Sequence, residues 1–295
     1  MKALPVILII MMLNVAHGQK KVAITIDDVP NIQNQSIIAT MDSLEVPVAI
    51  FINEKYVDNS QEGQQTLEEW ISKNWVTPGN HSYSHARYSE VGLDSFQTEI
   101  TQGEIYSRKL ASKYNKDLKY FRFPFNDLGK DSLLHIEILK YLNKKNYVNT
   151  PFTVESSDWI FNSLYEYYLK EGKADKADSI GEKYVTTTIA YFKHFSDLSK
   201  EVYGKEISHI SLCHDNLINA EYLPQIVTIL RGEGYEFLSL KEALKDSLYK
   251  QRDSYFQKWG ISWLYRWMEN SEVRKDYFKK EPSMEDILSL FKDLK

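Results

Sequence analysis

Cysteine is almost absent from this 295-residue chain, since Cys213 is the only one. A single cysteine excludes an intrachain disulfide, and its place in the apolar run 207–213 predicts a small buried strand residue. With 12 glycines and 8 prolines, the chain also lacks any low-complexity tract or linker rich in these residues. No internal repeat is visible. We therefore expect one large α/β domain or two smaller ones, either with ample core.

An excess of positive charge is also missing. The chain carries 36 Lys and Arg against 41 Asp and Glu, for a net charge of −5 and a pI of about 5.9. Such a surface does not attract nucleic acid or anionic membrane, so neither is expected as a partner. The expected partner is small or neutral. Aromatic residues make up 13% of the chain, which slightly favours a sugar ligand because aromatic faces stack on sugar rings.

The N-terminal apolar run, 4–15, is too short to span a bilayer comfortably. Lys2 supplies a short positive region before it, and Ala16-His17-Gly18 places small residues for cleavage before Gln19. We predict a signal peptide over 1–18 and an exported protein, periplasmic or secreted, with no stable membrane span after cleavage. An uncleaved anchor is the alternative, which the small residues disfavour.

Short β-branched runs alternate with helical patterns along most of the chain. Strands are predicted at 22–26, 46–52, 75–77, 120–123, 147–153, 207–213 and 235–240. Helices are predicted at 36–44, 65–73, 93–114, 132–143 and 220–231, the last with Asn219 as its N-cap. This alternation implies parallel pairing. About seven such units favour a barrel or near-barrel over an open sheet.

Two stretches lie outside this alternation. The segment at about 161–205 has a helical pattern without a strand and is interpreted as an insertion over the mouth or flank of the barrel. We expect a catalytic domain over 19–247 and a helical C-terminal extension over 248–295.

The extension places Tyr255, Trp259, Trp263 and Trp267 at four-residue spacing. This spacing favours packing of all four side chains against the barrel. Stacking on a sugar is the alternative.

The chain also contains two histidines four residues apart, His81 and His85. One turn of helix, or one tight loop, lets both face a single point. Imidazole and carboxylate bind borderline divalent cations, and three protein ligands leave a position free for water. HxxxH also arises by chance, so the remaining parts of a metal site must come from elsewhere in the sequence.

Five short motifs follow one another along 21–246, near the ends of predicted strands, where active sites of parallel α/β proteins collect. They are Thr25-Ile26-Asp27-Asp28, His81-Ser82-Tyr83-Ser84-His85, Arg122-Phe123-Pro124, Asp158-Trp159 and Leu212-Cys213-His214. Together they resemble the signature motifs of the polysaccharide deacetylase family, also called the NodB homology or carbohydrate esterase 4 family.

The resemblance implies an α/β fold, a distorted (β/α) barrel, and a metal-dependent hydrolase acting on carbon–nitrogen bonds other than peptide bonds. The family removes acetyl groups from N-acetylglucosamine polymers or, less often, from O-acetylated xylan. By position, Asp28, His81 and His85 would hold the metal, Asp27 would be the general base and His214 the general acid. One divalent ion is expected: zinc first, with cobalt, manganese or nickel open.

The same resemblance implies that Arg122 holds Asp27 and that Asp158 pairs with His214. Trp159 and Leu212 would wall the acetyl pocket. An acid suits the chemistry, because an amine is a poor leaving group until it is protonated. The alternatives are that Arg122 forms an ordinary ion pair on the surface and that Asp158 is a loop carboxylate capping the segment 159–167.

Three departures from the family pattern bear on the shape of the substrate site. Ile26 replaces an aromatic, Phe125-Asn126 stands where Tyr and Gly are usual, and Glu155 stands where Asp usually opens the fourth motif. The first hypothesis is a deacetylase of N-acetylglucosamine glycans, chitin-derived or peptidoglycan. An O-acetyl xylan esterase and a non-catalytic glycan-binding protein are the alternatives, and the oligomeric state stays open.

Overall fold

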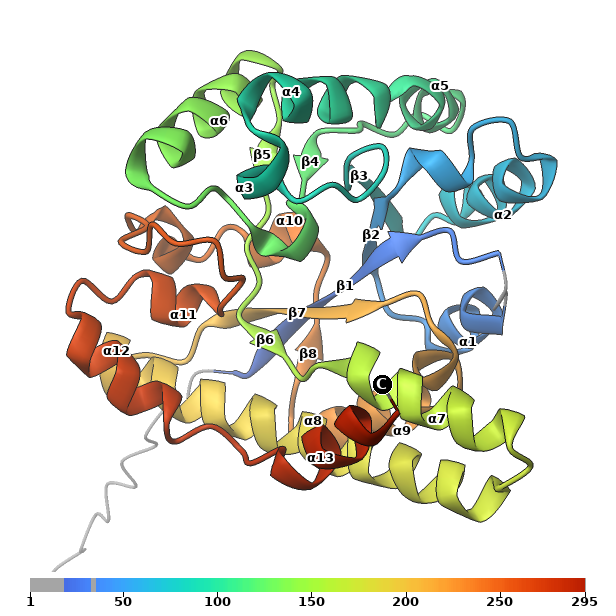
Figure 1. The fold of residues 1–295 in the computed structure, drawn as a ribbon, viewed down its shortest axis with the longest axis vertical. Helices are drawn as coiled ribbons and strands as arrows, with labels where there is room; N and C mark the ends of the chain where they lie inside the picture. The colour runs from blue at the N-terminus through green and yellow to red at the C-terminus, as the bar shows by residue number, and fades with distance from the viewer. Residues whose placement is uncertain (1–18, 33–35, 295) are drawn as a thin grey trace, which may run out of the picture.

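The computed structural model describes residues 19–32 and 36–294 (Figure 1). The predicted signal peptide, 1–18, lies outside the described residues. Within the described part, every helix is too short or too polar to cross a membrane.

Eight parallel strands form one sheet in the described residues. They are β1 (Lys21–Val29), β2 (Val48–Ile52), β3 (Val76–Asn80), β4 (Tyr120–Phe121), β5 (Val148–Asn149), β6 (Val154–Glu155), β7 (Ser208–His214) and β8 (Glu236–Phe237). The sheet follows the path β5-β4-β3-β2-β1-β7-β6, and β8 pairs with the start of β1. Its two ends, β5 and β6, are consecutive in the chain. The sheet therefore curls into a barrel that stays open between them, which confirms the predicted distorted (β/α) barrel.

The single strand predicted over 147–153 is wrong, because β5 and β6 are separate two-residue strands. The residues between them turn their backbone toward the inside of the barrel. There the carbonyl oxygens of Thr150 and Pro151 accept hydrogen bonds from the Arg122 guanidinium, at 3.5 and 3.1 Å. The buried Arg122 thus ties the connection between β5 and β6 to β1, where it also binds Thr25 and Asp27.

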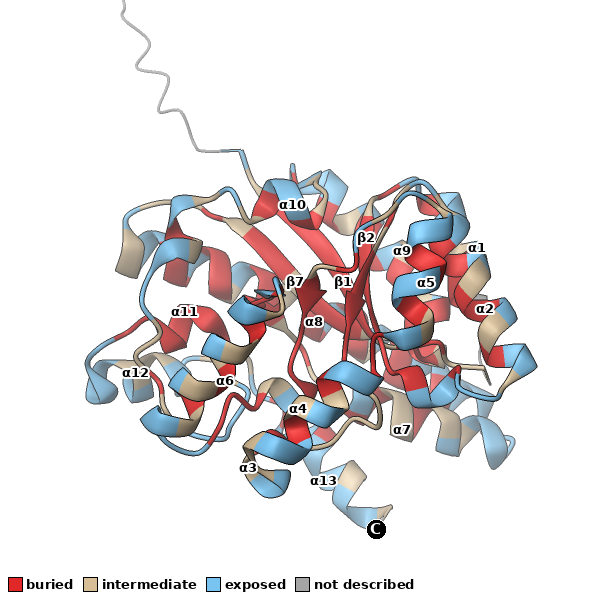
Figure 2. Ribbon diagram, turned by 90° about the horizontal axis from the view of Figure 1, so that it is seen from above, coloured by how far each residue is buried: buried red, intermediate tan, exposed pale blue. Residues whose placement is uncertain are grey.

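Helices cover the outside of the barrel, with their exposed faces turned outward (Figure 2). They are α1 (Ser36–Leu44), α2 (Gln61–Ser72), α3 (Tyr88–Val91), α4 (Leu93–Gln102), α5 (Ile105–Lys113), α6 (Ser132–Lys144), α7 (Asp158–Lys170), α8 (Ala174–Tyr203) and α9 (Leu217–Gly232), while the short α10 (Leu240–Ala243) lies at one end of the barrel. A small apolar cluster fills the inside: Ala23, Ala49, Phe51, Tyr120, Ile210, Leu240 and Ala243. Because two of these belong to α10, that short helix closes the end of the barrel where the strands begin.

The long helix predicted over 93–114 is two helices, α4 and α5, which are interrupted at Gly103. A β-carbon at Gly103 would lie 2.5 Å from the carbonyl carbon of Ser82, well inside contact distance. The break therefore lets the chain pass directly against the loop that carries the two histidines.

The helical segment predicted at 161–205 contains most of α7 and all of α8. Helix α8 packs against α7, α9 and β6, so it lies on the flank of the barrel. The C-terminal extension is only partly helical, with α11 (Trp263–Arg266), α12 (Ser271–Phe278) and α13 (Glu285–Asp293).

The four spaced aromatics of the extension do not share one helix face. Tyr255, Trp263 and Trp267 are buried, as the packing interpretation requires. Trp259 is 57% exposed and lies in an irregular stretch before α11, so that interpretation is wrong for it. Gly260 and the connection around it interrupt the helical pattern.

Candidate active site

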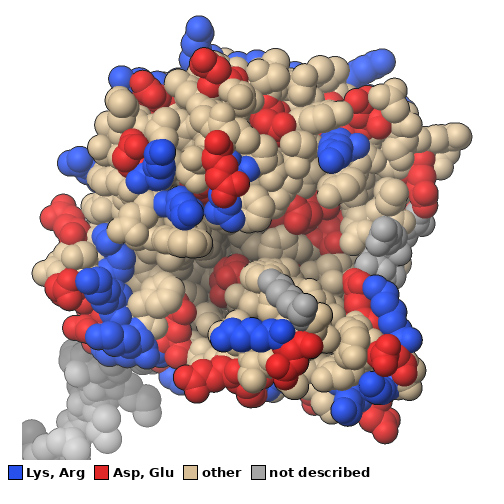
Figure 3. Space-filling view, in the orientation of Figure 1, with Lys and Arg blue, Asp and Glu red and all other residues tan. Residues whose placement is uncertain are grey.

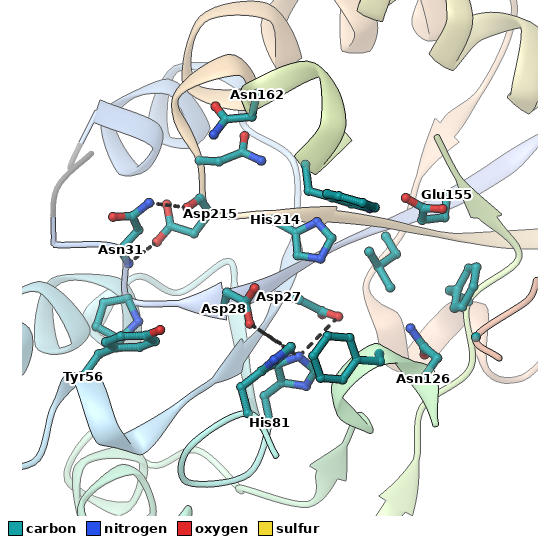
Figure 4. Close-up of a pocket in the computed structure, with 18 of the residues that line it drawn as sticks. Asp27, Asp28, Asn31, Tyr56, His81, Asn126, Glu155, Asn162, His214 and Asp215 are labelled. Atoms are coloured by element: carbon teal, nitrogen blue, oxygen red, sulfur yellow. Dashed lines mark hydrogen bonds and ion pairs between the residues drawn. The ribbon is translucent and has the colours of Figure 1, made fainter. Parts of the chain in front are cut away.

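A cleft of about 870 Å³ opens at the carboxyl ends of the strands. Figure 3 shows it as a hollow in one face of the molecule, with acidic side chains visible inside. Asp27 on β1 and His214 on β7 are register partners in adjacent parallel strands, so their side chains leave the same face of the sheet. Both line the cleft, together with Asp28, His81 and His85. Figure 4 shows Asp27, Asp28, His81 and His214 converging on one space.

Asp28, His81 and His85 form a group that could hold a metal ion, since one ligand atom from each lies within 4.8 Å of the others. The Oδ1 atom of Asp28 lies 3.6 Å from Nε2 of His81 and 3.4 Å from Nε2 of His85. The same oxygen is buried and accepts no hydrogen bond within the described residues. A buried carboxylate oxygen without a donor is costly, and a cation at this point would satisfy it.

The protonation of His81 fits a ligand role. Its Nδ1 lies 2.8 Å from the carbonyl oxygen of Arg122, which can only accept, so Nδ1 carries the proton. The lone pair of Nε2 therefore faces Asp28. Burial holds the pKa of His81 well below its ordinary value, and it also lowers the pKa of His85. Neutral imidazole is the form that binds a divalent metal.

The histidines lie on a tight loop, one of the two local geometries that the sequence allows. Ser82 and His85 adopt positive φ angles of 68° and 61°, which a helix does not permit. Side chains from elsewhere fix the loop: Asn53 Nδ2 donates to the His81 carbonyl at 2.6 Å, and Glu99 accepts from Ser84 N at 2.7 Å. The loop is thus positioned before any ligand arrives.

Arg122 is fully buried beneath the cleft, so the surface-pair interpretation is excluded. Its Nη1 donates to Asp27 Oδ1 at 3.0 Å and to Thr25 Oγ1 at 2.6 Å. Burial raises the pKa of Asp27 to about 6, although the Arg122 charge opposes that rise. The other carboxylate oxygen of Asp27 lies 3.8 Å from His81 Nε2. Asp27 is therefore held beside the predicted metal ligands.

His214 is held by Asp158. The Nδ1–H of His214 donates to Asp158 Oδ1 at 2.7 Å, and the His214 backbone N–H donates to Oδ2 at 2.8 Å. Burial opposes the imidazolium, but the charge and hydrogen bond of Asp158 outweigh it and raise the pKa of His214 to about 10. His214 is consequently charged at neutral pH, with Nε2 left to donate into the cleft.

Two further donors to Asp158 were not predicted. Asn216 Nδ2 and Asn219 Nδ2 both donate to its Oδ2, the first at 3.0 Å. The predicted capping role of Asn219 is wrong, because α9 begins at Leu217 and Asn216 caps it by accepting from Asn219 N. Both carboxylate oxygens of Asp158 accept hydrogen bonds from these two side chains and from His214. The clustering of Asn216 and Asn219 just after His214 is the only signal in the sequence that could have indicated them.

The predicted pocket residues Trp159 and Leu212 both line the cleft. Trp159 is 48% exposed and is braced by Phe291 of α13, whose ring centroid lies 5.6 Å away. Phe125 and Glu155, two of the departures from the family pattern, also line it. Burial raises the pKa of Glu155 to about 7. All nine predicted site residues therefore line this cleft or contact a residue that does.

The chain is similar in sequence to known proteins over part of its length. The sequence profile of a family described as Polysaccharide deacetylase matches residues 14–147. A curated relative, the peptidoglycan-N-acetylglucosamine deacetylase of Bacillus cereus, is 22% identical over 144 residues, which are 48% of this chain and 48% of the relative. The chain thus spans about half the length of the curated relative that it matches.

Several solved structures share the fold. A peptidoglycan N-acetylglucosamine deacetylase in complex with an N-oxidanyl-benzamide compound is 18% identical, with a TM-score of 0.54, covering 78% of this chain and 91% of that one. The catalytic domain of a peptidoglycan N-acetylglucosamine deacetylase from Eubacterium rectale is 17% identical, with a TM-score of 0.52, covering 75% and 89%.

A pseudoenzyme of carbohydrate esterase family 4 from Bacillus anthracis is equally similar, at 18% identity and a TM-score of 0.52, covering 77% of this chain and 66% of that one. At such identities the likeness establishes the fold. Because a pseudoenzyme shares it, activity has to be argued from the side chains in the cleft.

Proposed function

We propose that this chain, whose residues 14–147 match the polysaccharide deacetylase family, is an exported, metal-dependent hydrolase that removes acetyl groups from N-acetylglucosamine-containing glycans. The products are the free amine and acetate. One observation carries the proposal: Asp27 and His214 are register partners beside the Asp28, His81 and His85 group. A base and an acid are thereby available at one metal site.

The residues that would hold the metal are Asp28, His81 and His85. A divalent ion there would activate water and polarise the acetyl carbonyl, and zinc is the first candidate. Asp27 takes the proton from the attacking water, because a carboxylate with a pKa of about 6 is ionised at neutral pH yet still basic. Asp28 would not be available to take this proton, because its carboxylate would be bound to the metal.

His214 supplies the second proton. The amide nitrogen becomes a leaving group only when it is protonated, and His214 Nε2 carries a proton at neutral pH because Asp158 stabilises the imidazolium. The hydrogen bond from Nδ1 to Asp158 also fixes the ring plane, so the proton is aimed into the cleft. Trp159 and Leu212 would enclose the methyl group of the acetyl.

The test is acetate release from chito-oligosaccharides, peptidoglycan and acetylxylan. Each substrate is assayed with the untreated protein, with the protein after chelator treatment, and with the chelated protein after zinc is added back. We expect release from the N-acetylated substrates, loss with chelator and recovery with zinc. Release from acetylxylan alone would replace the proposal with an O-acetyl esterase. No release from any substrate, in a protein that binds no metal, would leave a non-catalytic glycan-binding protein.

A further inference from the structure

We propose that Trp259, in the C-terminal extension, is a stacking platform for a sugar ring of the substrate next to the ring that reacts. The inference rests on the proposed function, because it assigns a glycan to the same cleft. The sequence predicted Trp259 as a packing residue, and the extension lies outside the five motifs.

The backbone beside Trp259 is pressed against the loop that follows β4. A β-carbon at Gly260 would lie 2.2 Å from the carbonyl oxygen of Phe125 and 2.8 Å from Cβ of Asn126. Only glycine permits this approach. Phe125 and Asn126 themselves have positive φ angles of 56° and 49°, so the loop backbone turns sharply where the extension meets it. Trp259 and Gly260 consequently form part of the cleft wall.

The segment carrying Trp259 is anchored after the tryptophan. Ser262 Oγ donates to the carbonyl oxygen of Thr153 at 2.8 Å, and the backbone N–H of Trp263 donates to that of Phe152 at 3.0 Å. These carbonyls belong to the stretch between β5 and β6. The extension therefore covers the opening in the barrel.

The segment is also anchored before the tryptophan. The buried Arg266 guanidinium binds Asp253 Oδ2 through Nε at 2.9 Å and Nη2 at 2.6 Å, and His135 Nε2 lies 3.1 Å from the same oxygen. Because both ends of this segment are fixed, the loop that carries Trp259 loses little conformational entropy when a ligand binds.

The exposure of Trp259 is selective. Of the six tryptophans, all within the described residues, only Trp159 and Trp259 are more than about one third exposed, at 48% and 57%, and both line the cleft. The Lys258 ammonium lies over the Trp259 ring, 5.0 Å from its centroid, and so covers one face. A large exposed aromatic in a cleft marks a place for a ligand with an apolar face.

A pyranose ring matches this surface. Its axial C–H bonds form an apolar face that an indole can cover, while its equatorial hydroxyls stay in water. Trp159 has the role of pocket wall in our proposal, so Trp259 is left for a neighbouring ring of the chain. The cleft volume of about 870 Å³ is large enough for more than one sugar unit.

The experiment measures binding of the β-1,4-linked glucosamine dimer and tetramer by titration calorimetry, with no turnover possible because both lack acetyl groups. We expect Trp259→Ala to weaken tetramer binding about 10-fold, so that the affinity gained between dimer and tetramer largely disappears. Trp259→Phe should retain most of that gain, since a flat ring remains. Thermal unfolding of both variants checks that the fold is intact.

The matched control is Tyr167→Ala, which removes an aromatic of 39% exposure on α7 that does not line the cleft. It should leave both affinities unchanged. An unaltered dimer-to-tetramer ratio in Trp259→Ala, or an equal loss in Trp259→Phe, would overturn the platform. If acetate is never released but the ratio depends on Trp259, the deacetylase proposal fails and the platform stands. If acetate is released and the ratio is unaltered, only the platform fails.

Discussion

Asp27 and Asp158, on the two sides of the cleft, are both buried and both contact a positively charged side chain, yet their pKa values move in opposite directions. Burial raises the pKa of Asp27 to about 6, because the Arg122 charge and its one hydrogen bond to Asp27 offset only part of the desolvation. Burial also acts on Asp158, but the His214 charge, together with hydrogen bonds from His214 and Asn216, outweighs it and lowers the pKa of Asp158.

The difference teaches that the charges and hydrogen-bond donors around each carboxylate, and not the depth of its burial, separate the two pKa values. The less satisfied one keeps affinity for a proton and suits a base. The fully satisfied one stays an anion and keeps its histidine charged, which suits an acid. Groups whose environments push their pKa values apart are the natural acid and base of one reaction.

The largest effect is expected at the acid side. His214→Ala should lower kcat for an N-acetylated chito-oligosaccharide by about 10²–10⁴-fold, because no group then protonates the amine. An O-acetyl ester should lose far less, since an alkoxide leaves more readily than an amide anion. Steady-state kinetics on the two substrates measure the ratio. Equal losses on both substrates would remove His214 from the role of acid.

The next effect is on the stability of the base side. Arg122→Ala leaves Asp27 buried without a cation and should cost about 3–5 kcal/mol of unfolding free energy, measured in denaturant. Lys193→Ala is the control, because Lys193 pairs with Asp197 on the surface, where their side chains are 75% and 57% exposed. That change should leave the unfolding free energy almost unchanged, because an exposed ion pair contributes little to stability. Similar values for the two variants would contradict the burial argument.

A smaller effect is expected in the pH dependence of activity, through the pair of His214 and Asp158. His214 has its pKa raised to about 10, so the protonated acid is present below that pH and is lost as pH rises through it. Asp158→Asn removes the stabilising charge and should move the alkaline limb of kcat/KM to lower pH by about 1–3 units. A limb that stays in place would mean that another group sets it.

Much of this site was predictable because its residues follow parallel strands. Asp28, His81 and His214 are far apart in sequence, but the carboxyl ends of the strands bring them to one edge, and the motif order indicated their roles. The barrel itself followed from the alternation of strands and helices.

Other parts depend on contacts that no local pattern records. The sequence around Asn219 is typical of a helix cap, but its side chain donates a hydrogen bond to Asp158, which lies 61 residues earlier. Gly103 breaks a convincing helix because Ser82 lies against it. Trp259 fits a buried stripe by spacing, yet Gly260 packs on the Phe125 loop and turns the tryptophan into the cleft.

The central claim is that Asp27 is the base of a site whose metal is held by other residues. Its most direct test measures metal content and acetate release from a chito-oligosaccharide in Asp27→Asn and in His81→Ala. We predict that Asp27→Asn retains stoichiometric metal and loses turnover by at least about 10²-fold, while His81→Ala loses both. Undiminished turnover in Asp27→Asn, or full metal content in His81→Ala, would contradict the account.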